Sequence, residues 1–180
     1  PKHPYTEALV SAIPVPDPHY DRPRTEMSGA PRDPIDLGEG CRFRDRCPKV
    51  IPPDDLTVDQ AAYREVMAFR EALERDELPL DRIRESLDDP GDRDAFAAAI
   101  HNDYFSTELS GENATTLDSA LAAIAGGDHE TAIETLRERF ESVCEVTPRS
   151  IEAEADWHVA CHQYYDHDGQ VTEDHAITTD

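Results

Sequence analysis

The sequence predicts a mainly α-helical protein in which a helix-rich insertion interrupts a small, irregular region that carries four cysteines. Apolar residues recur at spacings of three and four between residues 56 and 143, which is the period of an amphipathic helix rather than of a strand. The cysteines form two pairs that flank this segment. With 180 residues, the chain is long enough for one domain or for a small domain with a large insertion.

A short helix is expected at residues 4–13. It ends before a proline, and Tyr5, Leu9 and Ile13 share one face, because residues four apart are neighbours on a helix surface. Ten residues bury little on their own, so we expect this face to pack against another body.

Residues 14–37 are expected to form a connector. Six prolines lie between residues 14 and 34, and each removes a backbone donor and disfavours helix in the residue before it. The result is a stiff, extended segment. The chain opens at Pro1 without a methionine, which we interpret as the start of an excised C-terminal piece.

Four or five helices are expected between residues 56 and 143. Thr57 and Gln60 form a capping-box signature for the first, and Asp128 is the expected N-cap of the last, whose C-terminal end carries Cys144. The residues expected to face inward are Ala62, Val66, Phe69, Leu73, Leu80, Ile83, Leu87, Phe96, Ala99, Ile100, Leu117, Leu121, Ile124, Ile133, Leu136, Phe140 and Val143.

The cysteine spacing indicates a shared metal site. Five residues lie between Cys41 and Cys47, sixteen lie between Cys144 and Cys161, and 96 residues separate the two pairs. If the four thiols meet, the intervening segment must leave one point and return to it. Four soft thiolates suit structural zinc or a [4Fe–4S] cluster, and a gap of five residues is long for a zinc knuckle, which favours the cluster.

Other interpretations of the cysteines stay open. They include two disulfides, four unrelated thiols, and a zinc site of three cysteines with His158 or His162.

After Tyr165, the tail at residues 166–180 has no periodicity and is expected to be mobile.

Residues around the first pair favour a buried anionic site. Gly40 lets the backbone approach a metal, and Phe43 is expected to cover the site. The neighbouring Arg42, Arg44 and Arg46 either offset the negative charge of thiolates or pair with the many carboxylates of the chain.

The charge of the chain limits its partners. The chain has 40 acidic and 17 basic residues, and its net charge is −23. This charge argues against direct binding of nucleic acid or of an anionic membrane surface. Only Lys2 and Lys49 are lysines, and such an acidic, lysine-poor composition suggests a halophilic source. No apolar run is long enough to span a bilayer, so any membrane contact is expected to come through a partner.

Three separated motifs carry a family resemblance. The chain reads His-Pro-Tyr-Thr-Glu-Ala-Leu-Val-Ser-Ala-Ile-Pro at residues 3–14, Gly-Cys-Arg-Phe-Arg-Asp-Arg-Cys-Pro at residues 40–48, and His-Val-Ala-Cys-His at residues 158–162. In their order and in their residues, these motifs resemble the C-terminal region of the ATP-binding subunits of oligopeptide/dipeptide ABC transporters. The matching parts are roughly residues 1–49 and 143–164.

This resemblance implies a peripheral ATPase subunit on the cytoplasmic face of the cell membrane. Its partners would be its own nucleotide-binding domain, a second ATPase subunit and the membrane permeases of a peptide importer. The resemblance also implies a structural or regulatory iron–sulfur site with Cys41, Cys47, Cys144 and Cys161 as ligands. The chain departs from the family in one respect, because relatives place the third cysteine only a few residues after the Cys-Pro pair.

No ATPase activity is expected of this chain alone. It contains no G-x-x-x-x-G-K-[ST] run, so ATP and magnesium would bind only in a preceding N-terminal part. Residues 109–113, Leu-Ser-Gly-Glu-Asn, differ from the LSGGQ signature of ABC ATPases at two of five positions, and we expect no phosphate binding there.

The alternative function is a standalone acidic interaction module with structural zinc. In the favoured interpretation the chain divides into the end of a nucleotide-binding domain (1–13), the connector (14–37), a cysteine-ligated domain (38–49 and 143–165), a helical insertion (50–142) and the tail (166–180).

Overall fold

The computed structural model describes residues 3–14, 16, 27, 40–146 and 159–164, and the chain divides into two compact units. The helical unit is Pro52–Glu141, and the cysteine unit joins Pro1–Ile51 to Ser142–Asp180. No strand occurs among the described residues, which confirms the mainly helical prediction.

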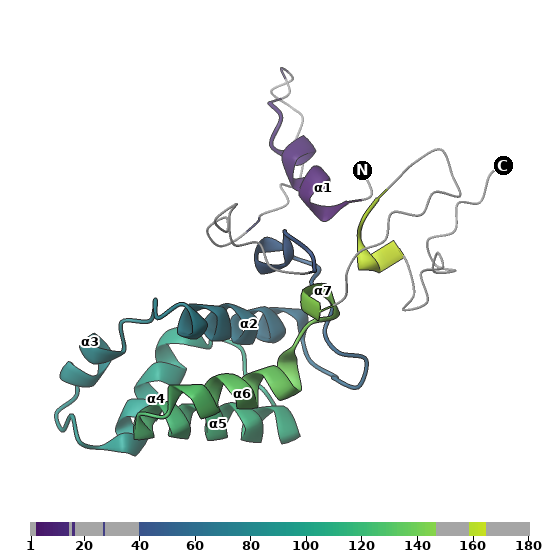
Figure 1. Ribbon diagram of the computed structural model, residues 1–180. Helices are drawn as coiled ribbons and strands as arrows, with labels where there is room; N and C mark the ends of the chain where they lie inside the picture. The colour runs from purple at the N-terminus through teal and green to yellow at the C-terminus, as the bar shows by residue number, and fades with distance from the viewer. Residues whose placement is uncertain (1–2, 15, 17–26, 28–39, 147–158, 165–180) are drawn as a thin grey trace. The chain divides into compact units, whose positions relative to one another are not determined.

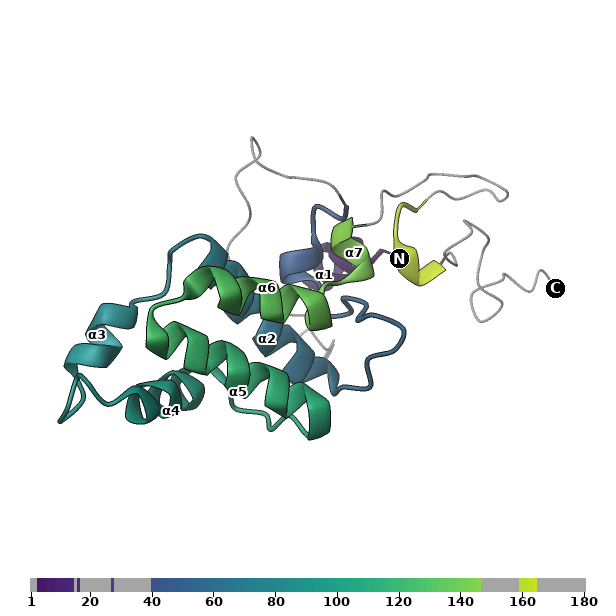
Figure 2. The same ribbon diagram turned by 60° about the horizontal axis from the view of Figure 1, so that its bottom comes forward.

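Five helices build the helical unit. Helix α5 packs against α4 and α6, α6 also packs against α2, and α3 packs against α4. The two views in Figures 1 and 2 show α5 and α6 side by side. The bounds are α2 (Gln60–Glu74), α3 (Leu80–Glu85), α4 (Arg93–Tyr104), α5 (Gly111–Gly126) and α6 (His129–Phe140).

Aspartates begin three of these helices. Asp92 and Asp128 accept hydrogen bonds from the backbone of Ala95 and Thr131, at 3.0 and 3.1 Å, and so satisfy amides that lack a partner within the helix. The prediction for α2 was wrong, because Asp59 caps it in place of Thr57 and accepts from Ala61 at 2.8 Å. An aspartate in extended backbone one residue before the helix is a better acceptor for these first amides than a threonine one turn earlier.

Aromatic side chains fill the core of the helical unit. The ring of Phe69 lies 5.1 Å from that of Phe105 and 5.3 Å from that of Tyr104, and the Tyr63 hydroxyl donates to the carbonyl of Phe140 at 3.0 Å. Most of the predicted inward residues are buried, together with Ala120, Ala125 and Ala132. Leu80, Leu87, Ala99, Ile133 and Val143 are only half-buried.

The last predicted helix is two helices. Helix α6 ends at Phe140, and Glu141 takes an extended conformation with ψ 120°. A new short helix, α7 (Val143–Val146), then begins in the cysteine unit. Cys144 therefore lies in α7 and not at the end of α6.

The cysteine unit has little regular structure. It contains α1 (Pro4–Ser11), α7 and two turns of 3₁₀ helix, η1 (Arg44–Arg46) and η2 (His162–Tyr164). Helix α1 ends two residues earlier than predicted, and Leu9 and Ile13 are 53% and 61% exposed.

Several sequence-based expectations fall outside the described residues. They concern almost all of the proline connector, His158 and the tail. Within the parts of the chain that the structure describes, no helix has the length and apolar character needed to cross a bilayer.

Candidate functional site

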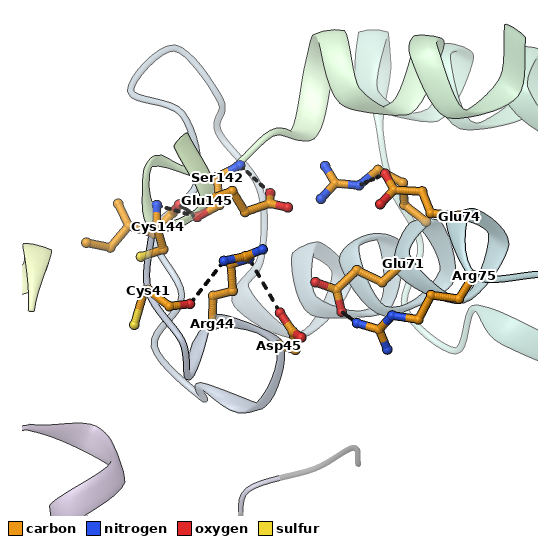
Figure 3. A network of polar contacts seen from close by, with 11 residues as sticks. Cys41, Arg44, Asp45, Glu71, Glu74, Arg75, Ser142, Cys144 and Glu145 are labelled. Carbon is orange, nitrogen blue, oxygen red and sulfur yellow. Dashed lines mark hydrogen bonds and ion pairs between the residues drawn. The ribbon is translucent and has the colours of Figure 1, made fainter. Parts of the chain in front are cut away.

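The two cysteine pairs meet where Gly40 and Cys41 approach α7. The backbone amide of Cys41 donates to the carbonyl of Cys144 at 2.6 Å, and both cysteines are 7% exposed (Figure 3). Gly40 makes this approach possible, because its φ is +77° and a Cβ there would overlap the carbonyl oxygens of Cys144 and Glu145. Gly40 was predicted to let the backbone approach a metal. In the structure it lets the backbone approach the carbonyl groups of Cys144 and Glu145.

A capping box holds Cys144 at this point. Ser142 Oγ accepts from the Cys144 amide at 3.0 Å, and the Ser142 amide donates to the Glu145 carboxylate at 2.8 Å. The same hydroxyl donates to the carbonyl of Ile51 at 2.6 Å, and Ser142 is fully buried. Sequence reasoning missed this motif, although Ser-x-x-Glu at residues 142–145 is its ordinary signature.

Cys47 follows η1 in the same unit. Its sulfur accepts from the amide of Lys49 at 3.4 Å. The pKa of the Cys47 thiol is raised to about 11, chiefly by burial and also by like-charge repulsion from Cys144, Cys161 and Cys41, while the hydrogen bond from the Lys49 amide lowers it. The other three cysteines are thus near enough to influence Cys47 electrostatically.

Cys161 begins the turn that forms η2. The amide of Tyr164 donates to the carbonyl of Cys161 at 3.1 Å, and the side-chain amide of Gln163 donates to the carbonyl of Lys49 at 2.9 Å. Val159 and Tyr164 are both 7% exposed, so an apolar residue and an aromatic residue are buried on either side of Cys161 in the sequence. Burial raises the pKa of Tyr164, and proximity to Cys161 raises it as well.

All four cysteines line one small cavity. Its volume of about 10 Å³ is room for about one water molecule. Tyr5 stacks on Phe43 with ring centroids 4.3 Å apart, and both rings contribute to the lining. None of the described residues that line the cavity is acidic, although the chain has 40 acidic residues. The polar and charged residues there are Cys41, Cys47, Cys144, Cys161, His3, His162, Arg44, Lys49 and Gln163.

The thiols are not drawn together into a coordination shell. Among the described residues, no group of three or more cysteine, histidine, aspartate or glutamate side chains is arranged to hold a metal ion. All four cysteines are free thiols. The kind of donor nevertheless fits a thiophilic group, since four sulfurs and no carboxylate line the cavity.

The predicted arginine cluster serves two purposes at Arg44. Its guanidinium donates to the carbonyl of Cys41 at 3.2 Å and lies 3.5 Å from the Asp45 carboxylate (Figure 3). The side chain is buried and lines the cavity. Arg44 therefore both fixes the loop that carries Cys41 and brings positive charge to the thiols.

The stretch that resembles the ABC signature has a structural use. Ser110 precedes α5, and Asn113 is 7% exposed. The Asn113 side chain donates to the carbonyl of Thr57 at 3.1 Å and accepts from Arg139 at 3.0 Å. These bonds fasten α5 to the start of the helical unit and to α6.

Comparison with known proteins agrees with the N-terminal motifs. Residues 1–53 match the family described as oligopeptide/dipeptide transporter, C-terminal region. The oligopeptide transport ATP-binding protein OppF of Escherichia coli is 48% identical over 54 residues, which are 29% of this chain and 16% of OppF. YkfD of Bacillus subtilis, whose name assigns it to oligopeptide transport, is 46% identical over 54 residues, again 29% of this chain and 16% of the relative.

A peptide import ATP-binding protein of Brucella abortus is 47% identical over 60 residues, which cover 33% of this chain and 19% of that protein. The chain thus spans less than one fifth of the length of the curated relatives it matches. No solved structure matches it.

A second family model covers most of the rest of the chain. Residues 60–157, more than half of the sequence, match the family described as Domain of unknown function (DUF8228). This match includes the helical unit from α2 onward and continues through Cys144. The chain belongs to this DUF8228 family, and its N-terminal region is related to the C-terminal region of the ATP-binding subunits of peptide transporters.

Proposed function

We propose that the chain is the C-terminal accessory region of the ATP-binding subunit of an oligopeptide or dipeptide ABC importer. The observation that carries the proposal is the match of residues 1–53 to that region of transporter subunits. In this function the chain works at the cytoplasmic face of the membrane, beside a second ATPase subunit and the permeases. ATP hydrolysis belongs to the nucleotide-binding domain that such a subunit carries.

Helix α1 is the proposed contact with that domain. Leu9 of α1 and Ile13, two residues after the end of the helix, are both more than half exposed, so two large apolar side chains are in contact with solvent. We place the nucleotide-binding domain on this face.

We further propose that Cys41, Cys47, Cys144 and Cys161 hold a [4Fe–4S] cluster. The support is the common cavity, its lack of acidic residues, and the positive charges of Arg44 and Lys49 on its lining, because a cluster with four thiolates is an anion. When bound, the cluster would cross-link two distant chain segments and could exchange one electron. Its role would be structural or regulatory.

Anaerobic reconstitution with iron and sulfide tests the cluster. We expect about four irons and four sulfides per chain, brown protein, and visible absorption that bleaches on reduction. Colourless protein with one stoichiometric zinc would reject the cluster.

A zinc-binding interaction module is the second candidate. It draws on one observation, that His3 and His162 line the cavity with the cysteines, since zinc accepts nitrogen and sulfur ligands together. Zinc that survives His162→Ala but not Cys144→Ser would favour four sulfur ligands, and the reverse would favour a mixed site.

We also propose that the acidic surface adapts the protein to concentrated salt. The helical unit carries 23 acidic and 8 basic side chains, so it repels itself at low ionic strength. Its melting temperature should rise steadily between 0.1 and 2 M potassium chloride. A flat or falling curve would contradict this proposal.

A further inference from the structure

Three segments of the cysteine unit converge on Lys49. Its amide donates to Cys47 Sγ at 3.4 Å, its carbonyl accepts from Gln163 at 2.9 Å, and its ammonium lies 3.4 Å from the Glu7 carboxylate of α1. Lys49 is the one lysine among the described residues, and it lines the thiol cavity.

The bond to Gln163 connects the turn after Cys161 to Lys49. Gln163 is two residues after Cys161, and the turn of η2 makes the spacing between them rigid, because the Tyr164 amide bonds back to the Cys161 carbonyl at 3.1 Å. Lys49 is likewise two residues after Cys47, whose sulfur its amide contacts. One side-chain amide thus joins the turn that carries Cys161 to the turn that carries Cys47, across 114 residues of sequence.

Helix α1 contacts Lys49 through the ion pair with Glu7. The ion pair between Lys49 and Glu7 is half-exposed, with side chains 50% and 38% accessible, so it contributes little energy. The amide bond between Gln163 and Lys49 is neutral, so salt screens it less than the ion pair, and it connects the two loops. Gln163 is therefore the side chain whose loss should move Cys161 without disturbing Cys41 and Cys144, which are joined through their own backbone.

We propose that Gln163 is a positioning residue that holds Cys161 at the lining of the thiol cavity through the carbonyl of Lys49. In the metal-free protein it limits access to Cys161, and in the loaded protein it secures the fourth ligand. The second part rests on the proposed cluster, whereas the first does not.

Cysteine alkylation in the metal-free, reduced chain tests the positioning alone. Gln163→Met keeps the length of the side chain but removes the donor, and we expect iodoacetamide to modify Cys161 about fivefold faster, as expected from the loss of one hydrogen bond, with Cys41 unchanged. Gln163→Lys restores a donor and should return the rate to that of the parent. Its positive charge alone would favour the thiolate and speed the reaction, so a return to the slow rate cannot be a charge effect.

Cluster stability tests the second part. After anaerobic reconstitution, Gln163→Met should lose iron to a chelator several-fold faster than the parent, and Cys161→Ser should lose it at least as fast. Gln60→Met makes the same chemical change at an exposed glutamine of the helical unit and should behave as the parent.

The outcomes separate the two proposals. If the parent takes up no cluster, the proposed cofactor fails, and the alkylation rates still decide the role of Gln163. Equal Cys161 alkylation in the parent and in Gln163→Met, or no rescue by Gln163→Lys, would overturn the inference even if the parent is fully loaded.

Discussion

At the scale of single residues, Gly40 is the described glycine with the least room for a side chain. It combines a left-handed backbone with carbonyl oxygens that occupy the place of a side chain. Any other residue must push Cys41 away from Cys144, because both strain and overlap oppose the native contact.

Gly40→Ala should therefore reduce metal uptake while leaving the helical unit folded. We expect iron content after reconstitution to fall several-fold and the far-ultraviolet circular dichroism to stay unchanged. Gly126→Ala is the matched control: its Cβ would meet nothing closer than 3.9 Å, so uptake should equal that of the parent. Full loading of Gly40→Ala would show that the contact between Cys41 and Cys144 is dispensable for the site.

At the scale of elements, α7 depends on its cap more than on its length. Four residues cannot form a stable helix from propensity alone, and the capping box supplies the missing order. Ser142 also bonds to Ile51, so the cap fixes α7 to the loop that enters the helical unit.

Ser142→Ala should weaken α7 by about 1 kcal/mol, the ordinary cost of a lost N-cap. The Cys144 amide, which donates to the lost hydroxyl, should exchange its hydrogen about fivefold faster, as measured by mass spectrometry. Ser110→Ala serves as the control, since Ser110 precedes α5 but makes no capping bond through its side chain. Unchanged exchange at Cys144 would mean that the hydroxyl does not hold α7.

The N-cap Asp128 makes the stability of α6 depend on pH. The backbone and hydroxyl of Thr131 donate to its carboxylate and lower the pKa of Asp128 below its usual 3.8. A lowered pKa in the folded state means that the ionised cap stabilises the protein fully above about pH 4, and that this contribution is lost as pH falls through the folded pKa. The difference in melting temperature between the parent and Asp128→Ala should thus be constant from pH 5 to 7 and shrink below pH 4. A difference that persists unchanged at pH 2 would contradict this assignment.

At the scale of the whole molecule, the helical unit is an insertion in the sequence between the two halves of the cysteine unit. Closing a loop costs about 0.6 kcal/mol for each doubling of its length, so about ninety residues cost only about 2.4 kcal/mol more than about six. The helices of the unit bury a core of their own, so their folding does not need the cysteines.

Replacement of residues 52–141 by a short Gly/Ser linker should leave metal uptake near that of the parent. Cys144→Ser should reduce uptake in both the full and the shortened chain. If the shortened chain takes up no metal while remaining soluble, the helical unit takes part in forming the site.

Much of this architecture follows from the sequence, and the exceptions have physical causes. Periodicity predicts the helices of the helical unit because each buries one face in a shared core, and glycine and proline mark their ends. The break between α6 and α7 was missed because Val143 continues the apolar spacing of α6, whereas the capping box at Ser142 outweighs that pattern locally. The return of the chain to the Cys41 loop at Cys144 was expected as part of a four-cysteine site, and the structure shows this backbone contact, but the described thiols form no metal-binding group. The contacts of Gln163 and Ser142 were not predicted, since no periodic signal marks a single bond across many residues.

The bond between Ser142 and Ile51 also bears on how such a chain could arise. It joins the residue just before the helical unit to the residue just after it, at 2.6 Å. A stretch of DNA that encodes residues 52–141 can therefore enter or leave an ancestral gene in one recombination event. The residues on either side of it, Ile51 and Ser142, would keep the same distance from each other. The match to transporter subunits stops at residue 53, beside this junction, as expected if the ancestor lacked the stretch. Descendants with and without it would then differ in length by an entire domain while keeping the same cysteine fold.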